Sequence, residues 1–163
     1  MKMQKRRRKE NKTDYLNRLR LLKSGSARIV FRRTNKYFIS QYITSRQAQD
    51  KIEMGVNSKQ LLKYGWPKES SGSLKSIPAA YLTGYLIGEQ INKKKAETPI
   101  IDFGMLRVLQ KTKVHAFLKG LVDAGIKIKC KEKDFPDEER IKGKQLKNKI
   151  DVEGIKNKIG EEK

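Results

Sequence analysis

The sequence has few of the residue types that most enzymes use for chemistry. It contains one cysteine, Cys130, and one histidine, His115. A single cysteine permits no internal disulfide and fits a reducing cytoplasm. His115 lies beside Val114 and Phe117 in an apolar helical pattern, which favours a structural imidazole over a ligand or a base. One histidine and one distant cysteine do not form a catalytic triad or a transition-metal site, so we expect no catalytic residue, no metal and no cofactor.

Long apolar runs and phosphate-binding loops are also missing. No run approaches the ~18 apolar residues that a membrane span requires, so no membrane partner is expected. Gly84 and Gly88 are not followed by the Lys-Ser/Thr of a Walker-type loop and are expected to permit close helix packing. Asp102 ends a short apolar strand, a position that sheet enzymes use, but no other carboxylates converge on it. We therefore expect Asp102 to form a turn or a helix cap.

Acidic residues are scarce, and the resulting positive charge is concentrated at one end of the chain. The sequence has 39 lysines and arginines against 18 acidic residues, a formal net charge of +21. Residues 1–36 hold 14 basic and 2 acidic side chains, whereas residues 131–163 hold 10 and 9. So large a charge opposes compaction through self-repulsion unless a polyanion neutralises it. The basic end therefore indicates a surface that faces a polyanionic partner.

The basic end is expected to be an extension with one short helix. Residues 1–12 show no hydrophobic period and should be disordered in isolation. Leucines then recur at three-residue spacing up to residue 22, with Thr13 as the expected N-cap and Asp14 favouring the first turn. A Ser-Gly-Ser segment ends this helix.

Three antiparallel strands are expected next. Residues 28–33 place apolar side chains and arginines on opposite faces of a strand. Residues 34–36 supply a turn, in which Asn35 tolerates the left-handed conformation of tight hairpins. Residues 37–43 return as the second strand, and a weaker third strand is expected around residues 50–56.

Helices and strands alternate in the second half of the chain. One helix opens at Ser76 as its N-cap, and another includes Val114–Leu121. Strands are expected at Pro99–Phe103 and Ile126–Cys130. Because successive strands joined through a helix pair in parallel with right-handed crossovers, we predict an α/β fold: a mixed β-sheet with helices packed on it.

We divide the chain into a basic N-terminal extension (residues 1–24), an α/β core (residues 25–130) and a charged C-terminal extension (residues 131–163). The C-terminal extension contains scattered Val152, Ile155 and Ile159 among charged residues. Disorder in isolation is expected for it. A marginal helix or a docking arm is the alternative.

Basic side chains alternate with aromatic rings from the N-terminal extension into the first hairpin. Guanidinium groups pair with phosphates in a bidentate way, and rings and guanidinium planes stack on unpaired bases. The alternative, that Arg28 and Arg32 form only the solvated face of a strand, is less favoured beside so basic an extension. The RNA-binding candidates are Lys5, Arg6, Arg7, Arg8, Lys12, Tyr15, Arg18, Arg20, Arg28, Arg32, Arg33, Lys36 and Tyr37.

RNA is favoured over DNA as the partner. We find no helix-turn-helix, zinc-finger or zipper pattern, so the sequence offers no element for reading a DNA groove. A folded core with long basic extensions suits a large structured RNA, because its packed phosphates neutralise segments that cannot fold alone.

Six segments occur in an order that is typical of one family: Lys12–Leu22, Arg32–Lys36, Pro78–Gly84, Ile101–Gly104, Leu118–Gly125 and Phe135–Gly143. They resemble large-subunit ribosomal protein eighteen of the archaeal branch, which is related to the eukaryotic large-subunit protein five. The resemblance implies a ribonuclease-H-like α/β motif without catalysis, in a cytoplasmic large subunit. It implies binding to 5S and large-subunit ribosomal RNA in the central protuberance. It also implies contact with the 5S-binding ribosomal protein five, and adds Thr13 and Asn35 to the RNA-binding candidates.

Two other functions are weighed against this one. A non-catalytic RNA-binding assembly factor would use the same surface but leave the mature particle. A nucleic-acid enzyme would need Asp102 and partner carboxylates around a metal ion.

Overall fold

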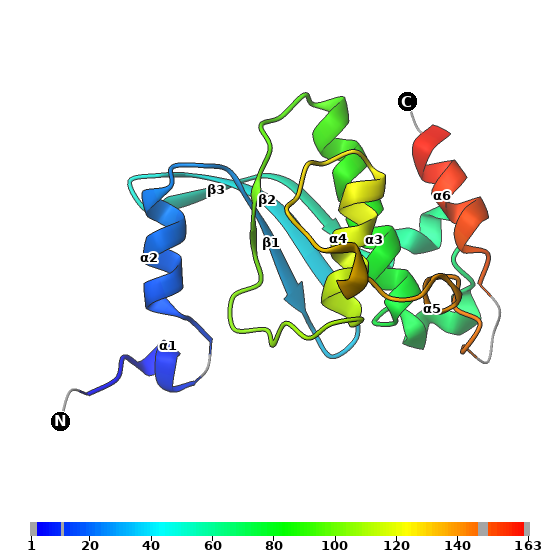
Figure 1. Cartoon of the computed structure of the whole chain (residues 1–163), viewed down its shortest axis with the longest axis horizontal. Helices are drawn as coiled ribbons and strands as arrows, with labels where there is room; N and C mark the ends of the chain where they lie inside the picture. Colours follow the sequence, from blue (N-terminus) through cyan, green and yellow to red (C-terminus); the bar gives the residue numbers. More distant parts are fainter. Residues whose placement is uncertain (1–2, 11, 147–149, 162–163) are drawn as a thin grey trace.

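The computed structural model describes residues 3–10, 12–146 and 150–161, and its centre is a mixed four-stranded sheet (Figure 1). The strands are β1 (Arg28–Arg33), β2 (Phe38–Arg46), β3 (Gln49–Asn57) and β4 (Ile100–Asp102), in the spatial order β3-β2-β1-β4. β2 pairs antiparallel with β1 and with β3, whereas β4 runs parallel to β1. The predicted α/β class, with helices packed on a mixed sheet, is confirmed.

Two long helices, α3 (Ile77–Lys93) and α4 (Lys113–Asp123), pack together on the sheet (Figure 1). The predicted N-cap of α3 is confirmed, because the Ser76 hydroxyl accepts a hydrogen bond from a first-turn amide. A methyl group at Gly84 would overlap the Phe117 carbonyl of α4. The close helix packing expected at this glycine is therefore confirmed.

Aromatic side chains join the sheet to α4. The rings of Phe31 on β1 and Phe117 on α4 stack with centroids 4.2 Å apart, and Phe38 on β2 stacks on Phe31 at 5.2 Å. Burying such a side chain contributes roughly 1.5–3 kcal/mol. Because side chains alternate along a strand, the same packing directs Arg28 and Arg32 to the other face of the sheet.

The N-terminal extension carries two helices, α1 (Arg6–Lys9) and α2 (Tyr15–Lys23), and neither has a buried residue. The sequence predicted disorder for residues 1–12, whereas α1 is one helical turn within them; residues 1, 2 and 11 lie outside the described residues. The prediction of Thr13 as the N-cap of α2 is wrong, because the Asp14 carboxylate accepts hydrogen bonds from two first-turn amides. The Thr13 hydroxyl instead accepts from Arg7 Nε at 3.0 Å.

The turn between β1 and β2 is held by a side chain and not by a left-handed residue. Asn35 is not among the described non-glycine residues with positive φ, so that expectation is wrong. The Thr34 hydroxyl donates to the Tyr37 carbonyl at 2.6 Å and accepts from the Tyr37 amide at 2.9 Å, which closes the turn. Left-handed residues do occur in the next hairpin, where Gln47 and Ala48 have φ of 48° and 62° in the two-residue turn between β2 and β3.

The prediction of a strand at Ile126–Cys130 is wrong. These residues form no ladder with the sheet, whose edge next to β1 is β4. Ile126 is 6% exposed and lies with Ala124 in the space that Gly88 leaves on α3. The chain after α4 therefore folds back on α3, because its buried side chain packs there and not beside β4.

The C-terminal extension is folded on the core, so the expectation of disorder is wrong. It contains the 3-10 helix η3 (Glu132–Asp134) and the helices α5 (Glu138–Ile141) and α6 (Val152–Glu161); residues 147–149 and 162–163 lie outside the described residues. α6 packs against α3 and the 3-10 helix η1 (Ser58–Tyr64) through three side chains that are at most 5% exposed, Val152, Ile155 and Ile159. Their helical spacing places them on one face, as a docking arm requires.

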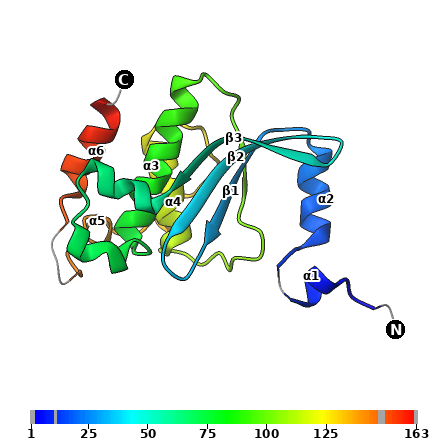
Figure 2. The same cartoon turned by 180° about the vertical axis from the view of Figure 1, so that it is seen from behind.

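Between β3 and α3 the chain forms two 3-10 helices, η1 and η2 (Lys68–Ser73). η1 ends at Gly65, which has φ of 104°. η2 forms in a stretch rich in serine and glycine. In both views α2 lies at the opposite end of the molecule from α5 and α6 (Figure 2).

Candidate nucleic-acid interface

Basic side chains from three parts of the chain converge on one hollow between the N-terminal extension and the sheet. We call it the first hollow, and it is lined by Arg7, Lys12, Thr13, Asp14, Asn17, Arg18, Arg32, Asp102 and Gly104. Five of these residues are candidates from the sequence: Arg7, Lys12, Thr13, Arg18 and Arg32. The fold therefore brings together side chains of α1, α2 and β1 that are separate in the sequence.

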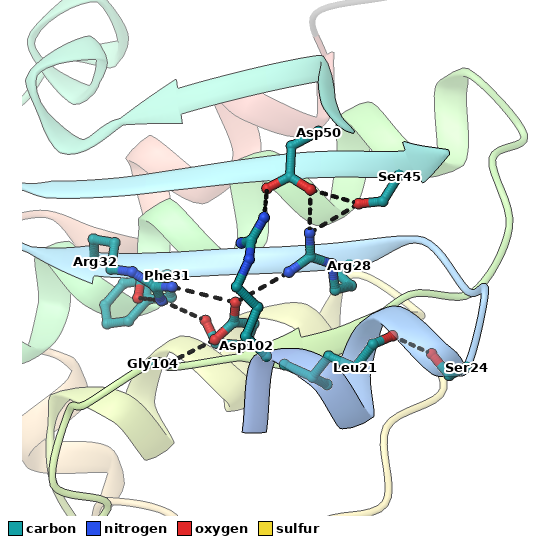
Figure 3. A network of polar contacts seen from close by, with 10 residues as sticks. Leu21, Ser24, Arg28, Phe31, Arg32, Ser45, Asp50, Asp102 and Gly104 are labelled. Atoms are coloured by element: carbon teal, nitrogen blue, oxygen red, sulfur yellow. Dashed lines mark hydrogen bonds and ion pairs between the residues drawn. The ribbon is translucent and has the colours of Figure 1, made fainter. Parts of the chain in front are cut away.

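Arg28 is buried beside the first hollow. Its side chain is 1% exposed, and its Nη2 donates to Asp50 at 2.8 Å and to Ser45 at 2.9 Å (Figure 3). Its Nη1 donates to Asp102 at 3.4 Å. A buried charge needs such partners, and here two carboxylates supply them. Arg28, an RNA-binding candidate from the sequence, is therefore not retained as a direct RNA contact, because its side chain does not reach the surface.

Asp102 forms the turn after β4 and holds Arg32. Its Oδ1 accepts from the Gly104 amide at 2.7 Å, which confirms the predicted turn-forming role. Its Oδ2 accepts from Arg32 Nη2 at 3.2 Å, and its backbone carbonyl accepts from Arg32 Nη1 at 2.8 Å (Figure 3). The Arg32 side chain remains 41% exposed, so the first hollow receives an oriented guanidinium.

Position 104 favours glycine for two reasons. Gly104 has φ of 61°, in the left-handed region that favours glycine. A Cβ at this position would also lie 3.0 Å from the guanidinium carbon of Arg32. A side chain here would therefore shift the Arg32 guanidinium from its position in the first hollow.

Asp50 connects α2 to the sheet. Its carboxylate accepts from Arg18 at 3.1 Å, from Arg28 at 2.8 Å and from the Ser45 hydroxyl at 2.7 Å. Burial alone would raise the pKa of Asp50, but hydrogen bonds from Ser45 and Arg18 and the charges of Arg28 and Arg18 outweigh it, so the pKa is lowered. Asp50 is therefore ionised at neutral pH and holds Arg18 at the first hollow.

Further candidates lie on the same two helices and are exposed: Lys5, Arg6, Arg8, Tyr15 and Arg20. The Lys5 ammonium lies 4.6 Å from the centre of the Tyr15 ring, a cation–π distance. Arg8 Nη1 lies 3.6 Å from the Asp14 carboxylate. The Arg6 side chain is 86% exposed. These side chains extend the positive surface from the first hollow along α1 and α2.

The remaining candidates do not line the first hollow. Arg33 is exposed at the end of β1 and, by strand alternation, projects to the opposite face from Arg32. Asn35 and Lys36 are exposed at the tip of the hairpin, and Tyr37 is half-buried against the core. The fifteen candidates therefore do not form one surface.

The residues that position the arginines were not predicted from the sequence. Asp50 was not selected, because nothing in its local sequence links it to Arg18 or Arg28. Gly104 was not selected as part of the site either. An acidic residue at the end of a strand, two positions before a glycine, is a turn signal that could have identified it.

The chemistry available to the first hollow is hydrogen-bond donation and positive charge. Among the residues that the structure describes, no group of three or more His, Cys, Asp or Glu side chains could hold a metal ion. No helix within the described ranges is long and apolar enough to cross a membrane. His115 is buried with its Nδ1 2.8 Å from the Leu109 carbonyl, which confirms its structural role. Guanidinium and ammonium donors of this kind suit phosphate groups.

Comparison with known proteins decides the family. Residues 1–99 match the family described as "Ribosomal large subunit proteins 60S L5, and 50S L18". The chain belongs to this family. It is 42% identical to the large ribosomal subunit protein uL18 of Korarchaeum cryptofilum, over 94% of this chain and 78% of that relative. The uL18 proteins of Methanoregula boonei and Methanothermobacter thermautotrophicus are 39% and 40% identical over 86% of this chain, and over 79% and 71% of their own length.

Membership of the uL18 family confirms the resemblance that the six segments indicated. Proteins of this family are structural components of ribosomes, which confirms the prediction that the chain is not an enzyme. The nuclease alternative on Asp102 is therefore set aside, and its carboxylate instead binds Arg28 and Arg32, two of the three arginines of β1.

Proposed function

We propose that the chain is a structural constituent of the large ribosomal subunit that binds 5S ribosomal RNA through the first hollow and the exposed basic residues of α1 and α2. Its place is the cytoplasmic ribosome, where it helps attach 5S RNA to the large-subunit RNA in the central protuberance. The observation that carries the proposal is the convergence of four cations, Arg7, Lys12, Arg18 and Arg32, on one concave surface.

The geometry suits phosphate binding because the two central arginines are fixed before any partner arrives. Arg18 is held by Asp50 at 3.1 Å and Arg32 by Asp102 at 3.2 Å, yet their side chains stay 39% and 41% exposed. Each guanidinium has five N–H donors, so donors remain for an external phosphate. Side chains that are already ordered lose less conformational entropy on binding.

Residues outside the first hollow support a wider contact. Arg20 and the hairpin residues Asn35, Lys36 and Tyr37 are proposed to contact neighbouring RNA segments. Large-subunit RNA and neighbouring ribosomal proteins, including the 5S-binding ribosomal protein five, are proposed as the other partners. Membership of a family of large-subunit proteins supports all of these proposed partners. The basic surface also supports RNA as one of them.

The test is binding of the full chain to purified archaeal 5S RNA across a series of salt concentrations, with transfer RNA as competitor. We expect binding that survives an excess of transfer RNA. We also expect the logarithm of the affinity to fall linearly with the logarithm of salt concentration. Displacement by equimolar transfer RNA, with the same salt dependence for both RNAs, would contradict specific recognition and leave only a basic polyelectrolyte.

A further inference from the structure

A second hollow lies at the same end of β1 as the first, but on the opposite face of the sheet, where α4 begins. Five cations line it: Arg33, Arg107, Lys111, Lys113 and Arg140. Its other lining residues are Thr112 and the apolar Phe31, Phe38, Ile77, Leu106, Leu109 and Val114, and no carboxylate lines it. It encloses about 350 Å³, which is within the size range of small-ligand sites. We call it the second hollow.

The positive charge of the second hollow is largely uncompensated. Among the described residues, Arg33, Arg107 and Lys113 have no side-chain hydrogen bond or ion pair, whereas Lys111 pairs with Asp137 at 3.0 Å. Burial, and then the charges of Arg33 and Lys75, lower the pKa of Lys113. The cations therefore repel one another in the free chain, and an anion bound among them would relieve that repulsion.

The start of α4 adds to this positive field. Thr112 is the N-cap residue, but its hydroxyl donates to the Leu109 carbonyl at 2.6 Å and caps no first-turn amide. The amides and the helix dipole therefore contribute partial positive charge next to Lys113.

We propose that the second hollow binds one unpaired nucleotide of ribosomal RNA, with its phosphate at Arg33 and Lys113 and its base against the apolar wall. The proposal rests on the proposed function and deepens it. A set of cations without a carboxylate suits a polyanion, and guanidinium planes beside apolar side chains suit a base that has left its stack.

The two hollows share the end of β1, where neighbouring residues line different hollows. Arg32 and Arg33 are adjacent at the end of β1, and consecutive side chains project to opposite faces. Arg32 therefore lines the first hollow and Arg33 the second. RNA bound at both would hold the end of β1 from two sides, so that this strand serves two RNA segments.

The test uses the full chain with Arg33→Gln and Lys113→Gln together. The probes are purified 5S RNA and purified large-subunit RNA, each read by affinity, salt dependence and hydroxyl-radical footprint. We expect affinity for at least one RNA to fall about tenfold or more, with a salt slope smaller by about 1–2, because up to two phosphate contacts are lost. In the footprint, the Arg33→Gln/Lys113→Gln variant should no longer protect certain nucleotides. An Arg7→Gln/Lys12→Gln variant, which changes the first hollow, should still protect those nucleotides.

A matched control removes two charges elsewhere. Lys127 and Lys129 are exposed and line neither hollow, so Lys127→Gln/Lys129→Gln should bind within about twofold of the unchanged chain. Leu109→Ala should weaken binding without changing the salt slope, since it shortens the apolar wall and removes no charge. If the double variant at Arg33 and Lys113 does not fold, Arg107→Gln on the exposed loop answers the same question.

The outcomes separate this inference from the proposed function. If the Arg33/Lys113 variant binds both RNAs like the control, with the same footprint, the inference is overturned and an acidic protein becomes the better occupant. The proposed function still stands in that case if Arg7→Gln/Lys12→Gln weakens 5S binding. If the unchanged chain shows no preference for 5S RNA over transfer RNA, it is the proposed function that fails.

Discussion

The helices α2 and α6, near the two ends of the chain, have similar apolar spacing but are held to the molecule in different ways. In α6, Val152, Ile155 and Ile159 are at most 5% exposed, whereas in α2 Leu16 and Leu19 are 59% and 51% exposed. α6 therefore docks through apolar contact. α2 is connected to the sheet through the ion pairs that Asp50 makes with Arg18 and Arg28.

The charge of the two extensions explains the difference. Residues 131–163 are almost neutral, so little repulsion opposes their folding onto the core. Residues 1–24 hold 10 basic and 2 acidic side chains, so few carboxylates are available to hold them. Apolar spacing thus predicts that a helix forms. The charge around the helix determines whether its apolar side chains are buried against the core.

The largest effect is expected when the apolar docking of α6 is weakened. Ile159→Ala removes a side chain that is 1% exposed and should lower the free energy of unfolding by about 2–5 kcal/mol. Leu19→Ala on α2 is the matched control and should change it by less than about 0.5 kcal/mol. Urea unfolding measures both, and equal effects would show that α2 and α6 are covered to the same degree.

A smaller effect is expected when the ionic docking of α2 is removed. Asp50→Asn should lower the free energy of unfolding by about 1–2 kcal/mol, because Asp50 is partly solvated and Arg28 keeps Asp102 as a partner. Hydrogen exchange should become faster in α2 and stay unchanged in α6. Faster exchange in α6 would show that the two ends are coupled.

Substitution of the turn glycine should have a still smaller effect on stability. Gly104→Ala places alanine at φ of 61°, which costs about 1 kcal/mol, and displaces the Arg32 guanidinium. Affinity for 5S RNA should fall several-fold as well. Gly72→Ala is the control, since Gly72 has open space and no positive φ, and it should leave both quantities unchanged.

The smallest expected effect is the pH dependence of stability, which tests the ionic contact of α2 through Asp50. The pKa of Asp50 is lowered in the folded chain, so its contribution to stability is complete above its ordinary pKa of 3.8. That contribution is lost as the pH falls through the folded pKa. The difference in unfolding free energy between the unchanged chain and Asp50→Asn should be constant from pH 7 to about 4 and shrink below that. A difference that shrinks between pH 7 and 5 would refute this assignment.

Much of the fold could be predicted from local patterns. The alternation at residues 28–33, the Ser76 cap and the glycine of α3 that meets α4 are all local signals, and the structure confirms each. The prediction of a strand at Ile126–Cys130 was wrong because alternating apolar residues do not indicate whether they pair in a sheet or pack on a helix. α6 was predicted only as the alternative to disorder, because its three buried side chains are separated by charged residues in the sequence.

The site was predictable only in part, because its geometry depends on distant residues. Charge and ring composition identified the basic end and four cations of the first hollow. The burial of Arg28 depends on Asp50 and Asp102, which are 22 and 74 residues away in the sequence. Local sequence could not show those contacts, so it could not separate Arg28 from the exposed Arg32.

The most direct test compares removal of two charges from each end of the chain. Arg7→Gln/Lys12→Gln acts in the first hollow, and Lys142→Gln/Lys144→Gln removes two exposed lysines from the C-terminal extension. We expect the first pair to lower 5S RNA affinity about tenfold or more, with a salt slope smaller by about 1.4–1.8, and the second pair to leave both nearly unchanged. Equal losses for the two pairs would contradict a defined RNA surface and show that only net charge matters.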